Sequence, residues 1–245
     1  MNITRFSLAA VFASSVLLTG ANGQTTATTE PVGFVTVGIT AGTGSAKKNT
    51  LFSVPLMETE AIDGQVAGII TGVTANTISN SNAGWTAGAL SQPATPFLIQ
   101  ITSGDAEGRL FLISSSANTG GAIAGTANTG TTVTVSSTDA AQVNLTTLGI
   151  VAGTDTYKIF ACDTLSSFFG TPASSGVQGG TSAATADTIV AVSNGVPSTY
   201  FFNTTSVKWV KQILGSPDAS NVALLPYFGI QYSRLANTAL SFVVT

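Results

Sequence analysis

The chain has no histidine and one cysteine, and only 8% of its 245 residues are Asp, Glu, Lys or Arg. An ordinary globular protein has about 25% charged residues. The absence of histidine removes the side chain that most often acts as general acid, general base or metal ligand. The shortage of charge leaves Ser, Thr, Asn and Gly to cover the surface. We therefore predict that the protein is not an enzyme and acts without a cofactor.

The single cysteine, Cys162, excludes a disulfide within the chain. It ends the apolar run Tyr157–Cys162, and free cysteines are among the most buried residues in proteins. We predict a buried, unreactive thiol. A chain of this length that lacks disulfides must be stabilised by apolar burial and by sheet hydrogen bonds.

Residues 1–23 have the pattern of a signal peptide. Arg5 supplies the positive charge, Phe6–Leu18 form an apolar segment too short for a membrane span, and Ala21–Gly23 are small residues at the cleavage position. We predict a secreted or outer-envelope protein with cleavage after Gly23, followed by a flexible lead-in at 24–30. An N-terminal anchor helix is the alternative, and no later segment approaches the length of a membrane span.

Charge argues against two classes of partner. Without Arg5, seven basic residues face eleven acidic ones, which gives a net charge of −4, and the sequence pI is about 4.7. Nucleic acids and anionic membranes both require a basic patch. We expect neither as a partner.

Apolar residues alternate with polar ones over many short segments, a pattern typical of half-buried strands. Turn residues such as Asp63-Gly64 and Ser103-Gly104-Asp105 separate these segments. The pattern predicts an all-β fold with an antiparallel sandwich or barrel-like domain. The predicted strands lie around Val35–Ile39, Phe52–Leu56, Phe97–Ile101, Leu110–Ile113, Val133–Val135, Tyr157–Cys162, Thr188–Val192, Thr199–Phe202, Val207–Val210, Phe228–Tyr232 and Leu240–Val244.

One short helix is predicted between Asp163, which can cap it, and Gly170, which can end it. The following stretch, 171–187, is rich in Gly, Ser and Ala and is the best linker candidate. It divides the chain into β-rich parts at 31–170 and 188–245, which are either two subdomains or parts of one unit.

Carboxylates gather in two loops. These residues are Glu58, Glu60 and Asp63 in the first loop, and Asp105 and Glu107 in the second. A flexible loop with several oxygen ligands is what Ca²⁺ requires, so Asp105 and Glu107 are the candidate calcium ligands. A hydrolase that uses paired carboxylates is a further hypothesis, and it needs two acids that face each other across a substrate.

Four aromatic residues are candidates for a platform on which sugar rings stack: Trp85, Trp209, Tyr200 and Tyr227. The alternative is that these side chains pack in the core or at its rim, because aromatic residues dominate burial in β-folds. The platform would make the protein a carbohydrate-binding or adhesion module.

Short segments also carry a family resemblance. They are Pro31–Thr36, Leu51–Leu56, Gly84-Trp85, Ile101–Gly104 with Glu107-Gly108, and Thr164-Leu165 with Phe168–Gly170. On these segments the chain resembles a family of uncharacterised secreted β-rich proteins of environmental Gram-negative bacteria, some of which carry a C-terminal sorting tail. The resemblance implies export and a β-rich fold, and it implies no known activity or catalytic residue.

The function that these features favour is structural. Sparse charge provides little repulsion between copies, and strands near the chain ends, Val32–Thr40 and Leu240–Val244, can offer unpaired edges to other molecules. We therefore predict a secreted or cell-envelope protein that assembles with itself or with envelope components into a surface layer, fibre or matrix. Carbohydrate binding is the alternative.

Overall fold

The fold is described from a computed structural model. It covers residues 35–54, 62, 64–92, 94–114, 127–137, 144–193, 195–226 and 228–244. The predicted signal peptide, 1–23, and lead-in, 24–30, lie outside these residues.

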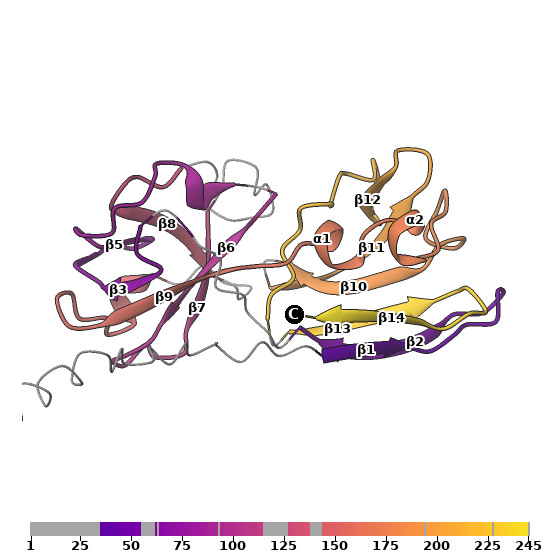
Figure 1. The fold of residues 1–245 in the computed structure, drawn as a ribbon, viewed down its shortest axis with the longest axis horizontal. Helices are drawn as coiled ribbons and strands as arrows, with labels where there is room; N and C mark the ends of the chain where they lie inside the picture. The colour runs from indigo at the N-terminus through magenta and orange to yellow at the C-terminus, as the bar shows by residue number, and fades with distance from the viewer. Residues whose placement is uncertain are drawn as a thin grey trace, which may run out of the picture. The chain divides into compact units, whose positions relative to one another are not determined.

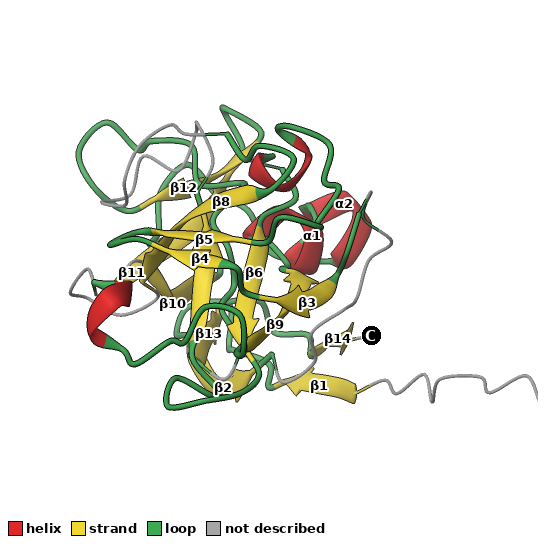
Figure 2. Ribbon diagram, turned by 90° about the vertical axis from the view of Figure 1, so that its left-hand side faces the viewer, coloured by secondary structure: helices red, strands yellow, loops and turns green. Residues whose placement is uncertain are grey.

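Short strands are the main regular secondary structure of the described chain (Figure 2). They are β1 (Val35–Ile39), β2 (Lys48–Ser53), β3 (Ala67–Ile69), β4 (Gly72–Val73), β5 (Thr77–Ser79), β6 (Phe97–Ile101), β7 (Leu110–Ile113), β8 (Thr132–Ser137), β9 (Thr156–Ala161), β10 (Thr188–Ser193), β11 (Val196–Asn203), β12 (Lys208–Lys211), β13 (Gly229–Arg234) and β14 (Leu240–Val244). Two α-helices, α1 (Leu165–Phe169) and α2 (Pro172–Ser175), and two 3₁₀ turns, Ala89–Ser91 and Leu145–Thr147, complete them.

The strands form three antiparallel sheets, which confirms the predicted all-β sandwich class. One sheet has the order β12-β11-β10-β13-β2, and a second has the order β3-β9-β6-β7-β8-β5-β4. The third contains only β1 and β14, the first and last strands of the described chain. Every pairing between named strands is antiparallel, as alternating apolar and polar residues favour.

The predicted helix is present, although its cap differs from the prediction. Thr164, not Asp163, is the N-cap: its hydroxyl accepts from the Ser167 backbone N at 3.0 Å, in a capping box. The helix ends at Gly170, whose φ of 62° favours glycine. Helix α2 was not predicted, and it uses the same kind of cap at Thr171. In the part of the chain that the structure describes, no helix is long and apolar enough to cross a membrane.

Core I joins the first and last strands of the described chain. It is the cluster of buried side chains from β1, α1, β10–β14 and the segments that follow β2, α2 and β12, and Phe52 of β2 packs against it. Phe169 of α1 is fully buried at its centre, with ring centroids 5.8 Å from Trp209, 5.8 Å from Tyr232 and 5.2 Å from Phe242. Such aromatic contacts add to the stabilisation from burial alone.

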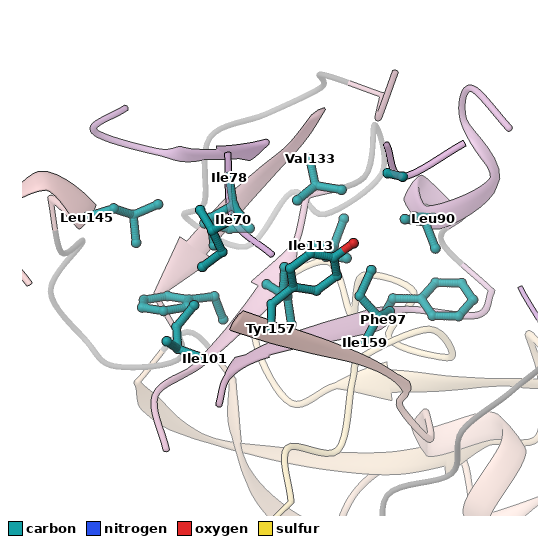
Figure 3. Packing of buried hydrophobic residues seen from close by; sticks show 14 of the residues in the cluster. Ile70, Ile78, Leu90, Phe97, Ile101, Ile113, Val133, Leu145, Tyr157 and Ile159 are labelled. Carbon is teal, nitrogen blue, oxygen red and sulfur yellow. The ribbon is translucent and has the colours of Figure 1, made fainter. Parts of the chain in front are cut away.

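Core II lies inside the seven-stranded sheet. Figure 3 labels side chains of this core that turn toward one another, among them Ile78, Ile101 and Val133. The end strands of this sheet, β3 and β4, are separated in sequence only by Ile70 and Thr71, so the sheet curves strongly around its core. Ile70 is fully buried, and its backbone N donates to the Asp155 carbonyl at 2.8 Å.

The boundary between core I and core II does not fall at the predicted linker. Core I combines strands from both predicted parts, 31–170 and 188–245, because β2 pairs with β13 and β1 pairs with β14. The segment 171–187 contains α2, and its Val177 and Asp187 are buried. It is therefore part of core I and does not connect two separate cores.

Replacing Phe169 with Ala should lower the free energy of unfolding by about 3–5 kcal/mol, because a large cavity would open among the five aromatic rings that contact it. Urea denaturation measures the change. Val196→Ala is the control: Val196 is 55% exposed, so its loss should change stability by less than about 0.5 kcal/mol. Equal losses in the two variants would contradict the assignment of Phe169 to the centre of core I.

Candidate functional site

The most elaborate polar arrangement is a buried ion pair between Asp187 and Arg234. The Asp187 carboxylate is completely buried, and one of its oxygens lies 2.5 Å from Arg234 Nη1. That oxygen, Oδ2, also accepts from the Tyr232 hydroxyl at 2.7 Å and from the Gln178 backbone N at 2.8 Å. Oδ1 accepts from the Leu235 backbone N at 2.7 Å. Such a saturated carboxylate is a structural group rather than an acid–base catalyst.

Arg234 uses its remaining donors on nearby backbone and side-chain oxygens. Nη1 donates to the Gly176 carbonyl at 2.9 Å, and Nε donates to the Thr238 carbonyl at 3.0 Å. Burial, followed by the negative charge of Asp187, raises the pKa of Tyr232. The network thus ties the segment after α2 to β13 and to the turn before β14.

Lys47 approaches the same region. Its Nζ donates to the Ala183 carbonyl at 2.6 Å and to Thr188 Oγ1 at 3.1 Å. Burial lowers the pKa of this amine, and the charge of Asp187 opposes the shift. Its two hydrogen bonds occupy the amine with protein oxygens, so Lys47 fixes the loop around Ala183.

The Asp187–Arg234 pair is not predicted from the sequence, which places Asp187 only at the end of the predicted linker and assigns no role to Arg234. The available signal was an arginine two residues after Tyr232, which continues the apolar positions of the alternating run Phe228–Tyr232. A charged side chain at an apolar position of a strand is almost never fully buried unless it is paired.

Three of the four predicted sugar-stacking residues are buried in the cores. Trp85 is 3% exposed, and Trp209 and Tyr200 are each 1% exposed. Each tryptophan also uses its indole N–H inside the protein: Trp85 donates to the Gln65 carbonyl at 3.0 Å, and Trp209 donates to the Gly170 carbonyl at 2.8 Å.

Stacking on a sugar requires an accessible ring face, so Trp85, Trp209 and Tyr200 do not form the predicted platform. The core-packing alternative describes them correctly, because burial removes more apolar surface from water than a rim position would. The fourth residue, Tyr227, lies outside the described residues.

The predicted calcium ligands Asp105 and Glu107 are exposed on the turn between β6 and β7. A third carboxylate, Asp155, is buried and accepts from the Val151 backbone N at 2.9 Å. Across the described ranges, no three His, Cys, Asp or Glu side chains are grouped so that they could hold a metal ion. Calcium needs about six to eight oxygen ligands, so Asp105 and Glu107 alone do not make a site.

Cys162 is buried, as predicted. Its Sγ donates to the Leu224 carbonyl at 3.2 Å, and the side chain packs with Leu98, Leu112 and Leu225. Burial raises its pKa to about 12, and the charge of Asp163 adds to the rise. The thiolate that a nucleophile requires is therefore disfavoured.

The remaining candidate is the sheet of β1 and β14, which we call the terminal sheet (Figure 1). The predicted edge segments Val32–Thr40 and Leu240–Val244 pair with each other inside one chain, in a register that runs from Val35 opposite Val244 to Ile39 opposite Leu240. Residues 32–34 lie outside the described part. Within the described ranges, each strand of this two-stranded sheet keeps one side without a strand partner.

The two faces of the terminal sheet differ. Ile39 and Phe242 point into core I and are 1% and 6% exposed. The outer face carries Thr36, Gly38, Ser241 and Val243, all exposed, and neither strand contains a charged residue. Natural proteins commonly protect such edges with Lys or Pro, and both are missing here.

Other strand edges in the described residues are better protected. On the outer side of β12, Val210 bridges to Asp218 and the Lys211 backbone N donates to the Pro217 carbonyl at 3.1 Å. The end strands β3 and β4 are three and two residues long, and only Ile70 and Thr71 separate them in sequence. Only β2 resembles the terminal sheet, with Leu51 74% exposed at the end of its sheet.

Comparison with protein family models, curated proteins and solved structures gave no match. The resemblance to secreted β-rich proteins therefore stays a prediction.

Asp187→Asn should destabilise the fold by about 3 kcal/mol or more, because it leaves the Arg234 charge buried without a counter-charge. Asp218→Asn is the matched control, since Asp218 pairs with Lys208 at 2.8 Å where both side chains are about half exposed. That exposed pair should contribute less than about 1 kcal/mol. Urea denaturation compares the variants, and equal effects would contradict a special role for the buried pair.

Cys162 should make stability depend on alkaline pH. The folded pKa lies near 12 and the ordinary value near 9, so the unfolded chain loses this proton first as the pH rises. The contribution is complete below pH 9 and falls by about 1.4 kcal/mol per pH unit above it. Unfolding free energies at pH 8 and 10.5 should fall more for the unmodified chain than for Cys162→Ala. Parallel pH profiles would contradict the assignment.

Proposed function

We propose that the protein is a secreted, non-enzymatic structural protein that assembles with copies of itself through the terminal sheet. The observation that carries the proposal is the pair of uncharged strand edges on β1 and β14 that have no strand partner among the described residues. An unpaired strand edge offers backbone N–H and C=O groups to another strand and is a template for association.

The use of the few charged side chains supports a role without turnover. Asp187 and Arg234 neutralise each other in core I, and Lys47 donates to protein oxygens. Lys208 pairs with Asp218 on the surface. Acid–base catalysis needs titratable side chains that converge on an accessible point. The charged side chains named above instead contact other protein groups, either inside the fold or on its surface.

The composition of the surface supports association between copies. The outer face of the terminal sheet presents Thr, Gly, Ser and Val side chains. Two such faces or edges can approach without burying an unpaired charge, which would carry a large desolvation cost. The proposed location outside the cell follows from the signal-peptide pattern at residues 1–23.

Carbohydrate binding is not proposed as a second function. Its predicted platform depended on exposed rings, and Trp85, Trp209 and Tyr200 are buried.

Val243→Lys should weaken assembly of the mature chain, residues 24–245, because each copy would place a charge on the associating strand. The concentration at which light scattering shows assembly should rise about tenfold, which corresponds to 1.4 kcal/mol. Thr36→Lys, on the partner strand, should act in the same direction.

Val151→Lys is the matched control for this test. Val151 is 55% exposed, close to the 60% of Val243, and it lies outside the terminal sheet. The control variant should assemble like the unmodified chain. An unmodified chain that stays monomeric at every concentration, or a control that is impaired as much as Val243→Lys, would overturn the proposed function.

A further inference from the structure

Strand β1 pairs with one strand only among the described residues. All five of its registered pairs are with β14, and no other strand of the described chain lies beside it in a sheet. Detaching β1 would therefore break no other strand pairing.

The point where β1 joins the fixed part of the chain is well defined. The Thr40 backbone N donates to Thr50 Oγ1 at 3.1 Å, and the Gly42 backbone N donates to the Ala236 carbonyl at 2.8 Å. A Cβ on Gly42 would lie 2.4 Å from the Arg234 carbonyl, so the chain is pressed against the end of β13 there. The joint between β1 and the anchored loop is thus Ile39-Thr40.

The position that β1 occupies on core I accepts only strands of a particular sequence pattern. Its inward side chains Val37 and Ile39 pack on core I, opposite Phe242 and Leu240 of β14. If β1 leaves, it uncovers an apolar groove and one backbone edge of β14. That groove accepts an uncharged strand with apolar residues at alternate positions, and the β1 strand of a second copy has this sequence and the matching register.

We propose that β1 is exchanged between copies, so that β1 of one molecule pairs with β14 of the next. This inference rests on the proposed function and specifies its contact. The exchanged strand makes the same contacts as it does within one chain, which makes exchange a low-cost route to association. Because neither strand carries a charge, nothing at this contact selects against a second copy.

A locked variant tests the exchange. Gly38 and Ser241 are directly opposite in the register and exposed, and a Cβ at Gly38 would meet nothing within 4 Å. The double variant Gly38→Cys/Ser241→Cys, treated as a dilute monomer with a short bifunctional thiol reagent, fixes β1 to its own β14. The native Cys162 is buried and does not compete.

Exchange predicts that the locked double variant assembles only at concentrations at least tenfold higher than the untreated double variant. Ser241→Cys alone, given the same treatment, is the control and should keep normal assembly. If the locked variant assembles normally, exchange is wrong, while the proposed function survives through contact between intact edges. If the unmodified chain does not assemble at all, both proposals fail.

A second measurement does not depend on how well the locked variant folds. Single variants Gly38→Cys and Ser241→Cys, one of them isotopically labelled, are mixed, assembled and then treated with the reagent. Mass spectrometry should find position 38 of one chain linked to position 241 of the other. Assembly with cross-links confined to other pairs, such as 38 to 38, would overturn the exchange.

Discussion

The pairing of β1 with β14 is the contact on which core I depends. It brings the two ends of the described chain together, and it places Ile39 and Phe242 over the aromatic group around Phe169. A chain with so little charge and no disulfide has mainly apolar burial and backbone hydrogen bonds to stabilise it. Strand β1 contributes both apolar burial and backbone hydrogen bonds, so its five residues have a large effect on the stability of the fold.

The buried Asp187–Arg234 pair adds specificity to this arrangement. It joins the segment after α2 to β13 and to the turn that leads into β14, so it fixes the site at which β1 must dock. A partly satisfied network would cost more than an apolar core, and here both carboxylate oxygens accept hydrogen bonds. One of the few ion pairs of the chain therefore lies where β13 and β14 pack against the segment after α2.

Local pattern was enough to predict most strands and the fold class. Alternation in Phe97–Ile101 predicted β6, and the continuous apolar run Leu110–Ile113 predicted β7, and the two strands pair side by side in the seven-stranded sheet. Strands β3, β4 and β5 were missed because they are two or three residues long, too short to show alternation, and Gly68 and Gly72 interrupt the first two. The division into cores could not be predicted, since the pairing of β2 with β13 joins residues far apart in sequence.

The candidate site was predicted only in outline. Both terminal segments were recognised as strand edges, yet sequence alone does not reveal that they pair with each other, because register is set by tertiary contacts. The aromatic residues misled for a related reason: a buried Trp85 and an exposed one look alike in sequence, and only the surrounding strands distinguish them.

Hydrogen exchange of the backbone amides in β1 and β14, followed as the mature chain is concentrated, tests the central claim most directly. Association through the terminal sheet predicts that protection rises at Val35–Ile39 and Leu240–Val244 while strands of core II such as β6 stay unchanged. Exchange rates in β1 and β14 that are the same at every concentration, in a chain that does associate, would contradict the account.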